Sequence, residues 1–114
     1  MALIFKIVAG EAWRAATAAA DFLGAEVDRT DGYIHFSTAA QASETAAKWF
    51  AGRADLVLVA VEADALGLAL RWEPSRGGAL FPHLYGALPL AAVAWARPLP
   101  LGADGRHDFG AFAC

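Results

Sequence analysis

The sequence predicts an α+β fold in one domain, residues 1–114, built from short strands and two main helices. Apolar runs of strand length and stretches of helical periodicity both occur, but they do not alternate as regular strand–helix–strand units. Several short segments alternate polar and apolar residues, which is typical of strands with one solvated face. A length of 114 residues suits one domain with its own core.

The N-terminal third predicts one strand and one helix. Ala2–Val8 is rich in Ile, Phe and Val, and the alternation places Lys6 on the face opposite the odd-numbered apolar residues. Glu11–Ala20 carries Trp13 and small residues at helical spacing, so we expect a helix. Asp21–Gly32 has no clear period and predicts a long irregular loop, of a kind that is often functional.

The middle of the chain predicts a short strand, a capped helix and a central strand. The short strand is Tyr33–Ser37. Thr38 with Gln41 three residues later forms a capping box, which starts a helix that runs to Phe50. Leu56–Val61 is continuously apolar, as expected for a strand that is covered on both faces.

The last third predicts strands separated by turns. The expected strands are Leu70–Glu73, His83–Tyr85 and Val93–Pro98. A turn or a single helical turn is expected at Asp64–Gly67. A glycine-containing loop is expected at Pro74–Phe81, a helical turn at Pro89–Ala92 and a polar tail at Leu101–Cys114, in which His107 is solvated. The four tryptophans lie at apolar-face positions and are expected in the core: Trp13, Trp49, Trp72 and Trp95.

Composition excludes several classes of protein. With 58 % hydrophobic and 18 % charged residues the chain is not disordered. A net charge of −3 argues against a general binder of nucleic acid or anionic membranes. The single cysteine, Cys114, excludes an internal disulfide.

The uncharged stretch Gly77–Ala96 is broken by prolines and glycines, which argues against a membrane-spanning helix. The N-terminus lacks a signal-peptide pattern, so we expect a soluble cytoplasmic protein. Its oligomeric state stays open.

Polar side chains on three predicted strands share faces, since residues two apart on a strand point the same way. By strand, these residues are Tyr33, His35 and Ser37; Arg71, Glu73 and Ser75; and His83 and Tyr85. If the sheet brings the three faces together, they form a cleft that holds imidazole, guanidinium, carboxylate and hydroxyl groups. The alternative is an ordinary solvated sheet face.

The predicted loop after Glu73 adds a candidate anion site. Gly77 and Gly78 let backbone N–H groups approach a ligand, and Arg76 offers a planar cation for phosphate or carboxylate. A flexible turn is the alternative, and neither a Rossmann nor a P-loop motif is present. His35, His83 and Glu73 are a chemically suitable but unpatterned set of metal ligands, so no metal is expected.

Three motifs resemble a known family: DGYIHFS at 31–37, WEPSRGG at 72–78 and FPHLYG at 81–86. In this order they resemble, over nearly the whole chain, a family of small bacterial proteins known only as a domain of unknown function. That family is similar in fold to ADP-ribosyltransferases, and nearest to the catalytic half of tRNA 2'-phosphotransferases. The segments that carry this second likeness are His35–Ser37, Thr38–Phe50 and Leu56–Ala63.

The resemblance implies a split, mostly antiparallel sheet around a nicotinamide–ribose cleft, with NAD or a related nucleotide as ligand. In such a cleft Arg71 or Arg76 would hold the diphosphate, and Tyr33 or Tyr85 would stack on the nicotinamide. The complete set of expected ligand-binding residues is Tyr33, Ser37, Arg71, Ser75, Arg76, Gly77, Gly78, His83 and Tyr85.

Glu73 and His35 are the expected catalytic residues. Glu73, kept ionised by a nearby arginine, would stabilise positive charge on the ribose as nicotinamide leaves and would orient the attacking hydroxyl. His35, with Ser37, would hydrogen-bond the ribose. A non-catalytic module that binds a metabolite or peptide in the same cleft, with Glu73 paired to Arg71, is the alternative.

Overall fold

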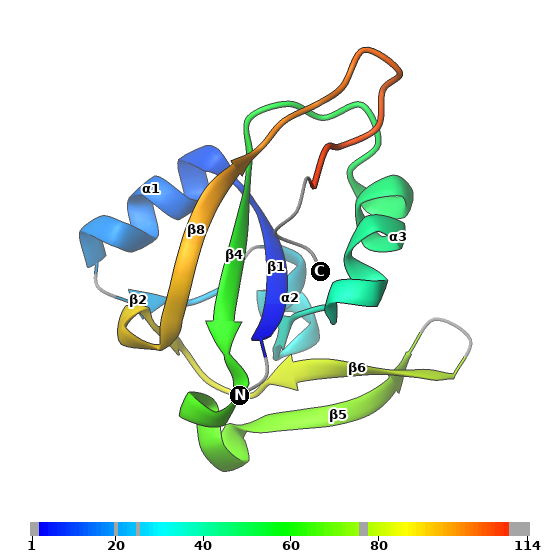
Figure 1. The fold of residues 1–114 in the computed structure, drawn as a ribbon. Helices are drawn as coiled ribbons and strands as arrows, with labels where there is room; N and C mark the ends of the chain where they lie inside the picture. The colour runs from blue at the N-terminus through cyan, green and yellow to red at the C-terminus, as the bar shows by residue number, and fades with distance from the viewer. Residues whose placement is uncertain (1–2, 20, 25, 76–77, 110–114) are drawn as a thin grey trace.

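The computed structural model describes residues 3–19, 21–24, 26–75 and 78–109, and it confirms the α+β class (Figure 1). All of the strand pairs that it describes are antiparallel. The elements in chain order are β1 (Leu3–Ala9), α1 (Gly10–Ala19), β2 (Asp21–Phe22), α2 (Glu26–Asp31), β3 (Ile34–His35), α3 (Ala39–Trp49), β4 (Leu56–Glu62), the 3-10 helix η1 (Ala63–Ala69), β5 (Leu70–Ser75), β6 (Ala79–Leu84), β7 (Leu88–Pro89), the 3-10 helix η2 (Leu90–Ala92) and β8 (Val93–Leu99).

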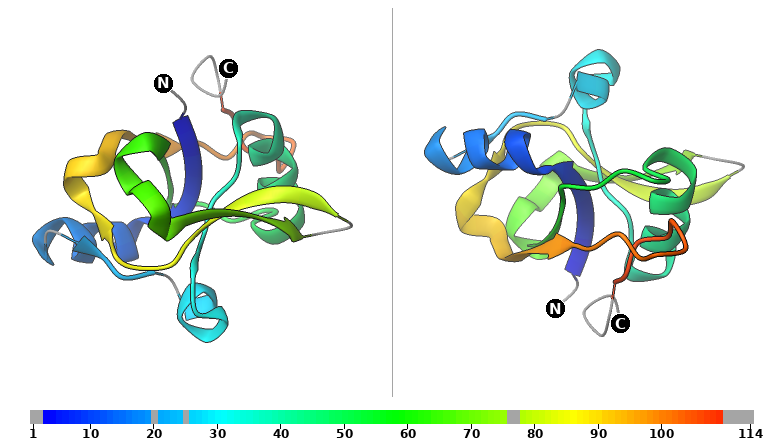
Figure 2. Two further views of the ribbon diagram at one scale, coloured as in Figure 1. Left: turned by 90° about the horizontal axis from the view of Figure 1, so that it is seen from below. Right: turned by 90° about the horizontal axis from the view of Figure 1, so that it is seen from above.

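The main sheet has the order β1-β4-β8 and is covered on both faces. Helix α1 lies against one face and α3 against the other, as the views in Figures 1 and 2 agree. Between them, Leu58 to Val61 in β4 have no exposed surface. The prediction of a central strand covered on both faces is therefore confirmed, because a continuous apolar run can be buried only in such a position.

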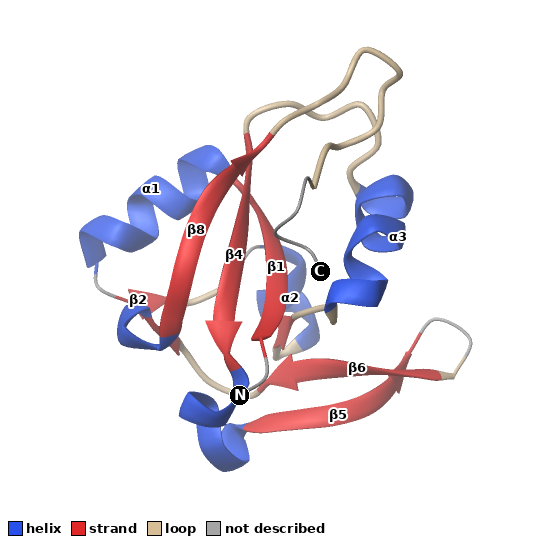
Figure 3. Cartoon of the chain, in the orientation of Figure 1, coloured by secondary structure: helices blue, strands red, loops and turns tan. Residues whose placement is uncertain are grey.

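A second sheet, of order β3-β6-β5, carries the polar strands, and a small β2-β7 pair completes the described sheets. Figure 3 shows the β5–β6 hairpin running crosswise below the main sheet. Strand pairing extends to Ser75 opposite Ala79, so the loop expected at Pro74–Phe81 is largely wrong. Pro74 is tolerated because β5 is an edge strand, where a missing N–H breaks no ladder.

Helix α3 begins as predicted, with both hydrogen bonds of the Thr38–Gln41 capping box formed.

The irregular loop expected at Asp21–Gly32 is wrong in part, because the segment holds β2 and α2. Both elements depend on partners distant in sequence: β2 pairs with β7, and Asp28 of α2 binds a lysine on β1. A search for local periodicity cannot detect such support. The helical turn expected as one possibility at Asp64–Gly67 is present and longer, because η1 covers Ala63–Ala69.

Two of the four tryptophans do not lie in the core. Trp13 is buried against Phe22, and Trp95 is partly buried against Phe5. Trp49 is 60 % exposed and Trp72 is 46 % exposed, so the core prediction is wrong for both. Trp49 is the last residue of α3, and Trp72 lies on the edge strand β5.

Among the described residues, no helix combines the length and the apolar character that crossing a bilayer requires.

Candidate functional site

The second sheet brings polar side chains from three strands together, as the sequence predicts for most of them. In the strand register His83 of β6 is paired with His35 of β3 on one side and with Arg71 of β5 on the other. The ring of Tyr33 lies 4.2 Å from that of His83 and 5.2 Å from that of Tyr85, centroid to centroid. We call Tyr33, His35, His83 and Tyr85 the aromatic cluster.

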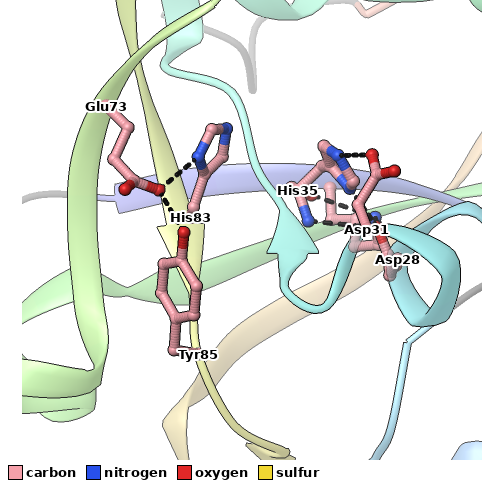
Figure 4. Close-up of polar contacts among 7 residues, drawn as sticks. Asp28, Asp31, His35, Glu73, His83 and Tyr85 are labelled. Carbon is pink, nitrogen blue, oxygen red and sulfur yellow. Dashed lines mark hydrogen bonds and ion pairs between the residues drawn. The ribbon is translucent and has the colours of Figure 1, made fainter.

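Glu73 joins the aromatic cluster through one carboxylate oxygen (Figure 4). Its Oε1 accepts hydrogen bonds from the Tyr85 hydroxyl at 2.7 Å and from His83 Nδ1 at 2.9 Å. These bonds, from Tyr85 first and then His83, lower the pKa of Glu73, and the positive charge of Arg71 contributes less. An ionised Glu73 is what the sequence hypothesis requires, although neighbouring hydrogen bonds are the main cause. None of the described residues bonds Oε2.

His35 lies between two carboxylates of α2. Its Nδ1 is 2.5 Å from Asp28 Oδ1, and its Nε2 is 2.9 Å from Asp31 Oδ2. Each ring nitrogen of His35 is thus within hydrogen-bond distance of a carboxylate oxygen. The backbone N–H of His35 also donates to Asp28. The position of His35 is therefore fixed by three hydrogen bonds to one short helix.

A buried lysine anchors this arrangement. Lys6 of β1 forms an ion pair with Asp28 at 3.0 Å and donates to the carbonyl oxygen of His35 at 2.9 Å. The side chains of Lys6 and Asp28 are only 7 % and 1 % exposed, and burial lowers the pKa of Lys6. Asp28 and Asp31 were missed as site residues, because nothing in the spacing of the predicted loop distinguishes them.

Arg71 lies over the ring of Tyr85, with its guanidinium carbon 5.1 Å from the ring centroid. This is the distance of a cation–π contact. The expected pairing of Arg71 with Glu73 is replaced by contacts of both residues with Tyr85. Arg71 is exposed, so its positive charge borders the aromatic cluster on the solvent side.

Several predicted ligand-binding residues do not join the cluster. The Oγ atom of Ser37 is buried 2.9 Å from Oγ1 of Thr45 in α3, because β3 ends at His35 and Ser37 pairs with β1. Ser75 and Gly78 lie at the far end of the β5–β6 hairpin. The two remaining predicted residues, Arg76 and Gly77, lie outside the described part of the chain.

The structure describes no metal centre. In the described ranges, no three or more His, Cys, Asp or Glu side chains are arranged to hold a metal ion. Both ring nitrogens of His35 face carboxylates, and Nδ1 of His83 is bonded to Glu73. The His35–His83–Glu73 metal hypothesis therefore has no support in this geometry.

A separate groove of about 550 Å³ lies between α3 and the segment 105–109. His107 lines this groove, and its Nε2 lies 2.8 Å from the carbonyl oxygen of Arg53, so the expected solvated histidine is instead partly buried. None of the described residues predicted as catalytic or ligand-binding lines this groove.

The fold and the cluster define a small α+β protein in which a carboxylate is hydrogen-bonded within a group of aromatic and imidazole rings. The chain belongs to the family described as a protein of unknown function, DUF952, whose model matches residues 7–96. This agrees with the resemblance stated from the sequence motifs, as far as the family of unknown function is concerned.

Two solved structures of protein CC0527 from Caulobacter crescentus are similar to this chain. Its crystal structure is 52 % identical over 97 % of both chains, with a TM-score of 0.93. Its solution NMR structure is 54 % identical over 96 % of this chain and 95 % of that one, with a TM-score of 0.87. The comparison with curated proteins found no match.

Proposed function

We propose that the protein binds NAD or a related nucleotide at the aromatic cluster, within an ADP-ribosyltransferase-like fold, and that Glu73 is the catalytic carboxylate of glycosyl transfer or hydrolysis. The observation that carries this proposal is the ionised Glu73 among rings from adjacent strands, with one oxygen not bonded by any described residue.

The chemistry of the cluster matches the parts of NAD. The nicotinamide ring of oxidised NAD carries a positive charge, and aromatic faces beside a carboxylate attract such a ring. Tyr33, Tyr85 and Glu73 supply these groups within one cluster. Arg71, exposed at its border, supplies a planar cation for the diphosphate.

In the proposed reaction, the bond between the nicotinamide nitrogen and the ribose carbon breaks. Its electron pair stays on nicotinamide, which leaves neutral, and positive charge develops on the ribose. Oε2 of Glu73 stabilises that charge because it is already ionised. A water or acceptor hydroxyl then bonds to the same carbon and gives its proton to Glu73, while His35 hydrogen-bonds the ribose.

Calorimetric titration with NAD, ADP-ribose and nicotinamide tests binding. We expect saturable heat with NAD and ADP-ribose, and the absence of heat at millimolar ligand for a folded sample would overturn the proposal. Glu73→Gln is expected to retain binding and to lose nicotinamide release. Glu11→Gln, which removes an exposed carboxylate in α1, is the matched control and should leave both unchanged.

A non-catalytic binding module is the second candidate, favoured by the structural hydrogen bonds that Glu73 already makes with two neighbours. In that case Glu73→Gln weakens ligand affinity or thermal stability, and the wild-type protein releases no nicotinamide. The two candidates therefore differ in one measurable product.

A further inference from the structure

His35 is held from two sides by carboxylates of very different accessibility. Asp28, on the Nδ1 side, has a side chain 1 % exposed, whereas Asp31, on the Nε2 side, has one 42 % exposed. The imidazole itself is 24 % exposed. We propose that Asp31 is a displaceable cap on His35, occupying the position in which an anionic oxygen of the ligand binds Nε2.

The hydrogen bond between Asp28 and His35 is much harder to break than the one between Asp31 and His35. The Asp28 carboxylate also contacts Lys6 at 3.0 Å and accepts the backbone N–H of His35 at 3.1 Å. Breaking these contacts would leave a buried charge without its partners, which is strongly unfavourable. Among the described residues, the Asp31 side chain bonds only Nε2 of His35, and its solvent exposure allows water to replace that bond.

The chemistry of the Asp31 carboxylate indicates which group of a ligand can replace it. Nε2 of His35 lies 2.9 Å from a carboxylate oxygen, and a ring N–H forms its strongest hydrogen bonds with charged oxygens. A carboxylate and a phosphate oxygen present the same acceptor to this hydrogen. The other groups around His35 are Lys6, which bonds its backbone oxygen, and the rings of Tyr33 and His83.

The inference rests on the proposed function only in assuming that the ligand is an anionic nucleotide. It assigns Nε2 of His35 to a phosphate oxygen in place of the ribose contact proposed above, because Nδ1 stays bonded to Asp28. It also makes Asp31 a competitor of the ligand, so that removal of its side chain strengthens the binding of anions.

The test compares Asp31→Ala with the control variant Asp64→Ala. Asp64 is also an exposed aspartate, but it lies in η1. The ring protons of His35 are followed by NMR during titration with inorganic phosphate and, separately, with ADP-ribose and nicotinamide. Because half-exposed ion pairs are weak, we expect Asp31→Ala to lower the Kd for phosphate and ADP-ribose roughly two- to five-fold. Nicotinamide, which has no anionic oxygen, should bind as in the wild type. Asp64→Ala should change none of the three.

The outcomes separate the cap from the proposed function. If phosphate shifts the His35 signals and binds more tightly to Asp31→Ala, the cap is supported even where NAD does not bind. If NAD binds the wild type but Asp31→Ala leaves the anion affinities unchanged or weaker, the cap is wrong and the proposed function stands. Phosphate that moves the His35 signals in neither protein also overturns the cap. Asp31→Asn, which keeps a neutral acceptor, should give an intermediate affinity and guards against misfolding of the alanine variant.

Discussion

The buried ion pair between Lys6 and Asp28 gives the sharpest prediction about stability. Lys6→Met keeps the apolar stem of the side chain and removes its ammonium group, so Asp28 loses the partner 3.0 Å away in a site where its side chain is 1 % exposed. Removing one member of a buried pair typically costs about 3–5 kcal/mol. Because His35 still contacts Asp28, we expect the lower end, about 3 kcal/mol. That cost is a large part of the free energy of unfolding of a typical domain, which is roughly 5–15 kcal/mol.

Urea unfolding followed by the fluorescence of the four tryptophans measures this cost. The matched control is Arg14→Met, which breaks an ion pair with Asp55 at 3.4 Å whose side chains are 67 % and 70 % exposed. An exposed pair contributes at most about 1 kcal/mol, so this variant should unfold near the wild-type midpoint. The double variant Lys6→Met/Asp28→Asn should be less unstable than the sum of the single changes. Equal, small effects of Lys6→Met and Arg14→Met would refute the account of a buried network.

Three further predictions concern Glu73, Tyr85 and the helix cap. The lowered pKa of Glu73 stabilises the folded protein. This stabilisation is complete above pH 4.5, the ordinary pKa of a glutamate, and is lost as the pH falls through the lower pKa of the folded state. Glu73→Gln should therefore flatten the acid side of a plot of urea midpoint against pH. The hydrogen bond to Glu73 raises the pKa of Tyr85. The resulting stabilisation of the folded protein is complete below pH 10.0, the ordinary pKa of a tyrosine, and is lost as the pH rises through the higher pKa of the folded state. In Glu73→Gln the phenolate absorbance of Tyr85 should therefore appear at lower pH than in the wild type. Thr38→Ala removes the cap of α3 and should cost about 1 kcal/mol in urea unfolding, whereas an unchanged midpoint would mean that the capping box contributes nothing.

Features encoded within a few residues were predictable from the sequence. The capping box of α3 needs only Thr38 and Gln41, and the burial of β4 follows from an unbroken apolar run. Strand alternation also placed His35, Glu73 and His83 on faces that meet. These predictions succeed because hydrogen bonding and side-chain direction in regular elements depend on near neighbours.

Features that depend on distant partners were not predictable. Lys6 and Asp28 are 22 residues apart, and neither lies in a recognisable motif, so their buried pairing emerges only when β1 and α2 meet. Ser37 follows the alternation of its strand but leaves the cluster, because β3 ends early and the chain moves to β1. Asp31 is an ordinary loop residue in the sequence, and its contact with His35 depends on the folding of α2.

The most direct test of the proposed site is NMR titration of the wild-type protein with NAD, observed at the ring protons of His35, His83 and Tyr85. We predict saturable shifts of these signals, retained in Glu73→Gln without release of nicotinamide. Shifts confined to His107 and the groove beside α3, or no shifts at millimolar NAD, would contradict the assignment of the nucleotide to the aromatic cluster.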